Sequence, residues 1–338
     1  MDRKLLQELS SGRISSAYLF YGSETFLMEE AMKRLEDQVL ASGENRDWNH
    51  TVMDLEEVPV QDLVREAETP SFFGERRLVV GKNAWFLTAS RGKDKQEHRP
   101  EELLRYAREP LSENVLVITV PAEKLDARKK VVKELKKHVR EAVFQPPDAR
   151  GLTRWVNDRL KRTGARIHPQ TTETLIRQTG GDLRLLDMEI RKLAIYVGPS
   201  GTITPDTVAA LVPRTLEQDV FKLVDRVARR KTGEAMAVFH DLLENREEPI
   251  RVLALLIRQF RLMLQIKVLA GKGLSEREIA SQLKVHPYPV KLALRQGKSF
   301  PEKTLRTLLH RAIETDQAIK SGQMDKTLAL ERLILTVR

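Results

Sequence analysis

Cysteine is absent from the 338 residues of the sequence, which excludes disulfide bonds, thiolate catalysis and cysteine-ligated metal. A chain without disulfides fits a reducing compartment. The first residues, MDRKLLQELSSGRISSAYLFYG, lack the apolar core of a signal peptide. The longest apolar stretch, 250–270, contains four basic residues, among them Arg258 and Lys267, which would be costly inside a bilayer. We therefore expect a cytoplasmic protein without a transmembrane span.

The motif of a nucleotide-hydrolysing enzyme is also missing. A phosphate loop needs Gly-x4-Gly-Lys-Ser/Thr, because backbone amides hold the phosphates, the lysine neutralises their charge and the hydroxyl binds magnesium. The turn after the first predicted strand reads YGSETFLMEE, in which Gly22 is followed by Ser23, Glu24 and Thr25. The second glycine, the lysine and the metal-binding hydroxyl are absent, and Glu24 would repel phosphate. We interpret Gly22–Thr25 as a degenerate phosphate loop that binds no nucleotide.

Other catalytic patterns are missing as well. The seven histidines are scattered without the HExxH spacing of a zinc site, and the Gly-x-Ser-x-Gly of a serine hydrolase does not occur. By elimination we expect a binding or mechanical protein with no catalytic site, metal or cofactor. The net charge of +10 suits a polyanionic partner such as nucleic acid. A basic protein without such a partner would carry the same charge, so charge alone leaves both interpretations open.

Strand and helix patterns alternate over the first part of the chain. Apolar runs predict five strands, at 17–22, 50–55, 77–82, 114–120 and 142–147. The run NVLVITV is typical of a strand in the middle of a parallel sheet. Since helical patterns separate these runs, we expect a doubly wound parallel α/β domain.

After Pro146-Pro147 the patterns are helical, and we expect no further strand. Pro213 marks a second boundary. The predicted organisation is therefore an α/β domain at 1–146, a small helical domain at 147–213 and a larger helical domain at 214–338. The predicted fold class is therefore multi-domain, with one α/β domain followed by two all-α domains.

One helical segment, 273–296, has the rhythm of a helix-turn-helix. Ser275 is expected to cap its first helix, and a turn leads to a second helix that could enter a DNA groove. Pro287 and Pro289 crowd the start of that second helix, and no Gln, Asn or Ser lies on its first turn to contact bases. A helical hairpin packed in an all-helical domain is the alternative that we favour over a DNA-binding regulator.

Aromatic residues make up only 5% of the chain, yet Phe72 and Phe73 stand side by side in the segment ETPSFFGERRLVV, 68–80. Pro, Ser and Gly around them predict a turn before the third strand. If both rings are exposed, the pair would suit an apolar pocket on a partner; the alternative is that one of the two rings packs under the sheet. Arg184 lies in the first turn of another predicted helix, at TGGDLRLLDMEIRKLAIY, and is a possible interface residue.

Taken together in this order and spacing, these motifs resemble one family, the delta subunit of bacterial DNA polymerase III, a part of the sliding-clamp loader. The resemblance includes YLFYGSETFLMEEA, TPSFFGERRLVV, GGDLRLLDMEIRKLAIY with ITPDTV, GLSEREIASQLKVHPYPVKLALRQ and ETDQAIKSGQMDKTLALERLIL. It implies an AAA+-type α/β domain, a small helical lid and a C-terminal helical collar that joins other loader subunits.

The resemblance also implies a function. Members of this family bind the ring-shaped sliding clamp, the beta subunit, and favour its opening for loading on primed DNA in replication. They do not bind ATP, which other subunits use. The clamp contact of the family corresponds to Ser71, Phe72 and Phe73, whereas Pro70 departs from the family pattern. The implied partners are the clamp, the delta-prime and tau/gamma subunits and primed DNA, within the DNA polymerase III holoenzyme.

Overall fold

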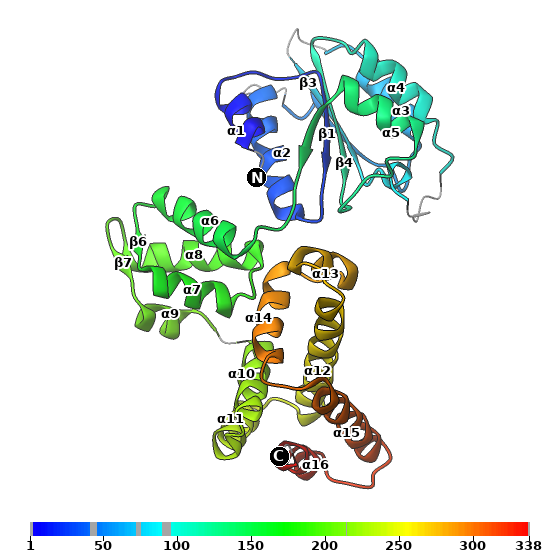
Figure 1. The fold of residues 1–338 in the computed structure, drawn as a ribbon. Helices are drawn as coiled ribbons and strands as arrows, with labels where there is room; N and C mark the ends of the chain where they lie inside the picture. Colours follow the sequence, from blue (N-terminus) through cyan, green and yellow to red (C-terminus); the bar gives the residue numbers. More distant parts are fainter. Residues whose placement is uncertain (1–2, 41–45, 72–75, 90–95, 214, 337–338) are drawn as a thin grey trace. The chain divides into compact units, whose positions relative to one another are not determined.

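A computed structural model of the chain divides into two compact units, Met1–Pro146 and Pro147–Arg338 (Figure 1). The residues that the structure describes are 3–40, 46–71, 76–89, 96–213 and 215–336. The predicted organisation into three domains, with a boundary after residue 213, stays a prediction.

The first unit contains a five-stranded sheet in the order β2-β3-β4-β1-β5, with all neighbouring strands parallel. The strands are β1 (Ala17–Tyr21), β2 (His50–Asp54), β3 (Arg77–Lys82), β4 (Asn114–Val120) and β5 (Arg140–Val143). Every residue of β4 is buried because this strand lies in the middle of the sheet, as its continuous apolar run predicts. The fifth strand begins two residues earlier than expected and ends at Val143.

Helices cover both faces of this sheet (Figure 1). One face carries α1 (Arg3–Ser10) and α2 (Thr25–Val39). The other carries α3 (Val60–Glu68), α4 (Pro100–Arg108) and α5 (Lys130–His138), while a short 3-10 turn, η1 (Trp85–Leu87), follows β3. Apolar residues of α3, α4 and α5 form a buried cluster with β1, β3 and β4. The predicted doubly wound α/β sheet is therefore confirmed.

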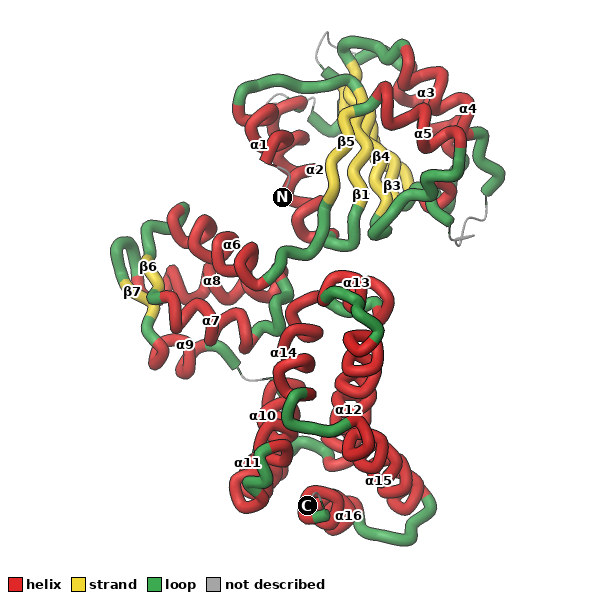
Figure 2. Tube along the Cα trace, viewed as in Figure 1, coloured by secondary structure: helices red, strands yellow, loops and turns green. Residues whose placement is uncertain are grey.

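The described residues of the second unit form helices and one small sheet (Figure 2). Its first part contains α6 (Ala149–Lys161), β6 (Arg166–Ile167), α7 (Pro169–Gln178), α8 (Leu183–Val197), β7 (Thr202–Ile203) and α9 (Pro205–Leu211). The expectation of no strand after Pro147 was wrong, because β6 and β7 form a parallel pair. Two residues per strand are too few to produce a periodic pattern in the sequence.

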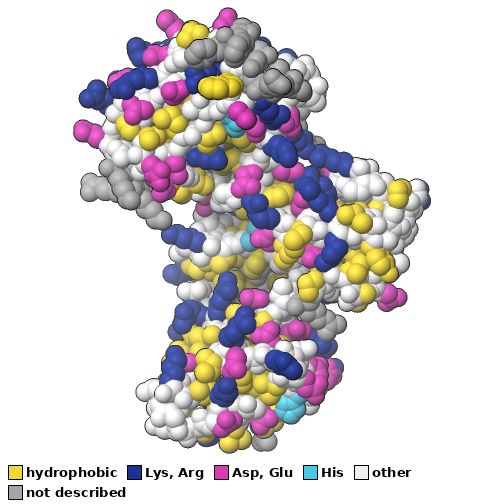
Figure 3. Space-filling model, turned by 180° about the vertical axis from the view of Figure 1, so that it is seen from behind, with side chains coloured by type: hydrophobic (Ala, Val, Ile, Leu, Met, Phe, Trp, Pro, Cys, Tyr) yellow, Lys and Arg dark blue, Asp and Glu magenta, His cyan; other side chains and the backbone are white. Residues whose placement is uncertain are grey.

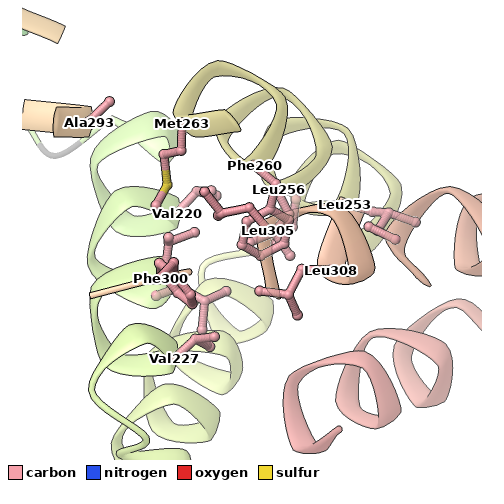
Figure 4. Packing of buried hydrophobic residues seen from close by; sticks show 14 of the residues in the cluster. Val220, Val227, Leu253, Leu256, Phe260, Met263, Ala293, Phe300, Leu305 and Leu308 are labelled. Atoms are coloured by element: carbon pink, nitrogen blue, oxygen red, sulfur yellow. The ribbon is translucent and has the colours of Figure 1, made fainter. Parts of the chain in front are cut away.

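Seven further helices follow among the described residues. They are α10 (Leu216–Ala228), α11 (Thr232–Glu244), α12 (Pro249–Gly271), α13 (Glu276–Leu283), α14 (Pro287–Gly297), α15 (Glu302–Lys320) and α16 (Lys326–Leu335). Their apolar faces meet in one buried cluster, where Phe260 and Met263 of α12 lie near Val220 of α10, with Leu305 of α15 close by (Figure 4). The helix at 250–270 is therefore a core helix, and no helix in the described ranges is long and apolar enough to cross a membrane.

Candidate functional site

The predicted clamp-binding segment belongs to the loop that enters β3 from α3, at the amino edge of the sheet. Three polar residues lie side by side along this edge. One lies just before the start of β2, and the other two are the first residues of β3 and β4. They are Asn49, Arg77 and Asn114, and they are only 2%, 8% and 0% exposed. Arg77 is level with Asn114, and the Leu78 N–H donates to the Asn49 carbonyl at 2.8 Å. We call these three residues the polar row.

Asn114 fixes the chain where it leaves α3. Its side-chain amide Nδ2 donates to the carbonyl oxygens of Ala67 at 2.7 Å and Thr69 at 2.8 Å. The last carbonyls of a helix have no partner within the helix, so an amide in this position satisfies groups that burial would otherwise penalise. The start of the loop is thereby held against the first residue of β4.

Asn49 holds the next part of the loop. The hydroxyl of Ser71 donates to its Oδ1 at 3.2 Å, and Ser71 is itself partly buried. The intervening Pro70 is exposed. Of the predicted contact, the structure therefore places Ser71 beside the polar row, whereas Phe72 and Phe73 lie outside the described residues and their role stays a prediction.

Arg77 anchors the chain where the loop ends and β3 begins. Its guanidinium Nη2 donates to the hydroxyl of Thr51 on β2 at 3.1 Å and to the carboxylate of Glu66 on α3. The ion pair with Glu66 connects β3 to the helix that precedes the loop. The described residues on either side of the loop, up to Ser71 and from Arg77, are thus held by polar contacts at the edge of the sheet.

The sequence carries only a weak signal for the polar row. Asn114 stands directly before the apolar residues of β4, and Asn49 lies two residues before the β-branched pair Thr51-Val52, at places where polar side chains are expected to lie outside the core. Their burial depends on carbonyl and hydroxyl partners that come from α3 and the loop, which are distant in sequence. Only the fold brings these groups together.

The degenerate phosphate loop lies at the opposite, carboxyl edge, after β1. The Gly22 N–H donates to the Val120 carbonyl at 3.2 Å, and the Glu24 N–H donates to the Phe144 carbonyl at 3.1 Å. A phosphate loop needs such amides free to point at the ligand. Since the carbonyls of Val120 on β4 and of Phe144 just after β5 accept from these two amides, and Glu24 adds a carboxylate, the geometry supports the prediction that this loop holds no nucleotide.

One further sequence prediction concerns the second unit. Arg184 is exposed in the first turn of α8, where the Asp182 side chain caps the helix by accepting from the Leu185 N–H at 2.9 Å. Its place in an interface stays a prediction.

Among the described residues, no group of His, Asp and Glu could hold a metal ion.

The segment 273–296 forms α13 and α14, which pack into the core of the second unit. Ile279 and Ala280 of α13 and Val290 and Ala293 of α14 belong to its buried cluster. Ser275 caps α13, as predicted, in a reciprocal capping box with Glu278. The arrangement is the packed helical hairpin that we favoured, and it gives no support to the DNA-binding regulator.

His286 caps α14 with its ring. The imidazole Nδ1 accepts from the Tyr288 N–H at 3.1 Å. Burial lowers the pKa of His286 to about 4, although the nearby Asp182 carboxylate opposes that shift. The ring is therefore neutral at physiological pH, which leaves Nδ1 able to accept this hydrogen bond.

Comparison with known proteins assigns the chain to a family. Residues 18–144 match the family model described as DNA polymerase III, delta subunit, and residues 217–337 match the model of the delta C-terminal domain. The DNA polymerase III subunit delta of Bacillus subtilis is 40% identical over 329 residues, which are 97% of this chain and 94% of that protein. The chain belongs to the DNA polymerase III delta subunit family. The resemblance stated from the sequence motifs is thus confirmed.

Other members of the delta family agree with this assignment. A probable DNA polymerase III subunit delta of Aquifex aeolicus is 22% identical over 261 residues, which cover 76% of this chain and 72% of that protein. The solved DNA clamp loader delta protein of Bacillus subtilis superposes with a TM-score of 0.83 at 39% identity, and covers 100% of this chain and 99% of that one. This structural match confirms the predicted fold class.

Proposed function

We propose that this protein is the delta subunit of a bacterial clamp loader, which binds the ring-shaped sliding clamp and favours its opening during replication. The observation that carries the proposal is the nearly full-length identity to a DNA polymerase III subunit delta, together with the fold of a clamp loader delta protein. In this role the chain has no catalytic site of its own and belongs to the polymerase complex in the cytoplasm.

In this proposal the clamp contact is Ser71-Phe72-Phe73. The polar row holds Ser71 and the described residues at both ends of the loop before any partner binds, through Asn49, Asn114 and Arg77. Ends that are already fixed lose less conformational entropy on binding, so more of the contact energy is expressed as affinity. Two phenyl rings entering an apolar pocket on the clamp would supply that contact energy.

Opening of the ring follows from differential affinity. A ligand shifts an equilibrium between closed and open rings only by as much as its affinities for the two states differ. The protein therefore acts as a wrench that binds the open ring more tightly and consumes no nucleotide. ATP is used by other loader subunits, in line with the occupied amides of Gly22 and Glu24.

The remaining partners are the delta-prime and tau/gamma subunits and primed DNA. The C-terminal helices expose Ile313, Leu328 and Leu335 at 45%, 57% and 50%, which supports assembly with other subunits through the collar. Lys and Arg side chains are interspersed with Asp and Glu on the face shown in Figure 3. Together with the net charge of +10, these basic side chains support contact with DNA phosphates. Such contacts do not distinguish one base sequence from another.

The proposal is tested with purified sliding clamp and the full chain. Clamps placed on nicked circular DNA can leave only through an opened ring, so the protein alone, without ATP, should speed their release. Clamps on linear DNA slide off the ends and provide the control. A chain that neither binds the clamp nor speeds its release from circles would overturn the proposed function.

A further inference from the structure

The positive charge of the protein is concentrated in one segment. The first unit contains 24 Lys and Arg residues and 26 Asp and Glu residues, whereas the second unit contains 34 and 22. Within the second unit, residues 249–300 contain ten Lys and Arg residues and only two acidic residues. This segment comprises α12, α13 and α14. Most of the excess positive charge therefore belongs to three consecutive helices.

Helix α12 presents part of this charge to solvent along one face. Its 23 residues include no Asp or Glu. Four polar residues of the helix and its C-cap are exposed and follow at intervals of three, four and seven residues, which places them on one face. They are Arg258, Arg261, Gln265 and Lys272, and we call them the α12 row. Another face of the helix points into the core through Phe260 and Met263 (Figure 4).

The three cations of the α12 row lack acidic partners. None of them forms an ion pair with an acidic residue in the described ranges. Arg251, earlier in the same helix, does pair with Glu247 at 3.4 Å. The adjoining helix α15 also pairs cations with its own carboxylates, Arg306 with Glu302 at 2.6 Å and Lys320 with Asp316 at 2.7 Å. The charge of the α12 row is thus not neutralised by the fold.

The length of the α12 row matches a stretch of nucleic-acid backbone. A helix rises about 1.5 Å per residue, so the row extends over about 21 Å. Each strand of B-DNA carries a phosphate about every 3.4 Å along the helix axis, so this length corresponds to about six phosphates. Lys and Arg neutralise phosphates, and an amide such as that of Gln265 can also donate to a phosphate oxygen.

We propose that the α12 row binds the phosphate backbone of duplex DNA. The inference rests on the proposed function, which includes DNA as a partner, and it adds the surface that makes the contact. The α13–α14 hairpin stays packed in the core and enters no groove. Since the contact is made to phosphates alone, it is independent of base sequence.

The experiment measures binding of the full chain to a fluorescent duplex of about 30 base pairs, at several salt concentrations from about 50 to 200 mM. The test variant combines Arg258→Gln, Arg261→Gln and Lys272→Gln. It should bind about thirtyfold or more weakly at the lowest salt. The slope of log affinity against log salt should fall by about two to three, because each lost phosphate contact removes about 0.9.

The matched control removes the same number of positive charges elsewhere in the second unit. It combines Arg229→Gln, Arg306→Gln and Lys320→Gln, three cations that already have acidic partners. We expect it to weaken DNA binding by less than about threefold and to leave the salt slope unchanged. The melting temperature of the α12 variant should stay close to that of the unmodified chain, because its three side chains are exposed.

The outcomes distinguish this inference from the proposed function. Equal losses for the two triple variants would show that only net charge matters, and would overturn the inference. Undiminished DNA binding by the α12 variant would also overturn it and would favour an acidic protein segment as the ligand of the row. So would an unmodified chain that does not bind the duplex at the lowest salt. The proposed function is tested separately by clamp binding and release, which the α12 variant should retain, and it fails if the unmodified chain does not bind the clamp.

Discussion

A Cβ atom at Gly22 would lie 1.9 Å from the carbonyl oxygen of Phe144. Gly22 also adopts a φ of +145°, a backbone conformation that side chains with a Cβ rarely enter. The glycine that remains of the phosphate loop therefore has a structural role. It lets β1 turn closely past the segment after β5, which explains its presence in a loop that we expect to hold no nucleotide.

Gly22→Ala should destabilise the protein by about 3–5 kcal/mol, because overpacking against backbone and strain at a positive φ add together. Chemical denaturation monitored by circular dichroism measures the change. The matched control is Gly12→Ala, since Gly12 has a φ of +71° and a methyl group there would meet nothing within 4 Å. This control should lose only about 1 kcal/mol. Similar losses for both variants would show that the close approach to Phe144 is unimportant.

The protein should show no binding of ATP in titration calorimetry up to millimolar nucleotide. A second variant, Glu24→Lys, supplies a cation near the loop but leaves the backbone amides of residues 22 and 24 bonded to the carbonyls of Val120 and Phe144. It should also fail to bind, because backbone amides provide the phosphate cradle. Micromolar binding by the unmodified chain would contradict our interpretation of Gly22–Thr25, and binding gained by Glu24→Lys would show that charge alone was missing.

Asn114→Ala should cost about 2 kcal/mol or more in unfolding free energy, because it leaves the carbonyls of Ala67 and Thr69 without the donor they have in the structure. It should also weaken clamp binding, since the entry to the loop is no longer held. The control Asn157→Ala changes the same residue type at an exposed position of α6 and should have little effect on either quantity. If Asn114→Ala were as stable as the unmodified protein, the hydrogen bonds of the polar row would not be what holds the start of the loop.

Most of the architecture could be predicted from the sequence because buried strands and helices place apolar residues in continuous runs or at regular spacings. The fully buried β4 appears as NVLVITV, and four of the five strands begin where their apolar runs begin. The polar row could not be predicted, since Asn49, Arg77 and Asn114 acquire their partners only when α3 and three strands meet. Nor could β6 and β7, whose two-residue pairing carries no period.

Stability should depend on pH through His286. The pKa of this ring is about 4 in the folded protein and about 6.5 in an unfolded chain, so the unfolded state takes up the proton first as pH falls. The contribution of the neutral ring is fully present above pH 6.5 and is lost as pH falls toward 4. It amounts to at most about 3 kcal/mol.

The variant His286→Asn keeps a side chain that can cap the helix but removes the imidazole, which is the group that titrates. Between pH 6.5 and 4, the unmodified protein should therefore lose melting temperature more steeply than this variant, while the two should keep a constant difference above pH 7. Parallel curves across the whole range would show that protonation of His286 is not coupled to folding.

Phe72→Ala with Phe73→Ala should weaken clamp binding by about a hundredfold or more. Burying a phenyl ring stabilises a complex by roughly 1.5–3 kcal/mol, and each 1.4 kcal/mol is about tenfold in affinity. The fold should persist, because the contacts that hold the loop come from Asn49, Asn114 and Arg77 and remain in the variant. Thermal unfolding of the free variant is the control. If clamp affinity is unchanged while the melting temperature collapses, the two rings belong to the core, and the clamp contact must be sought elsewhere on the molecule.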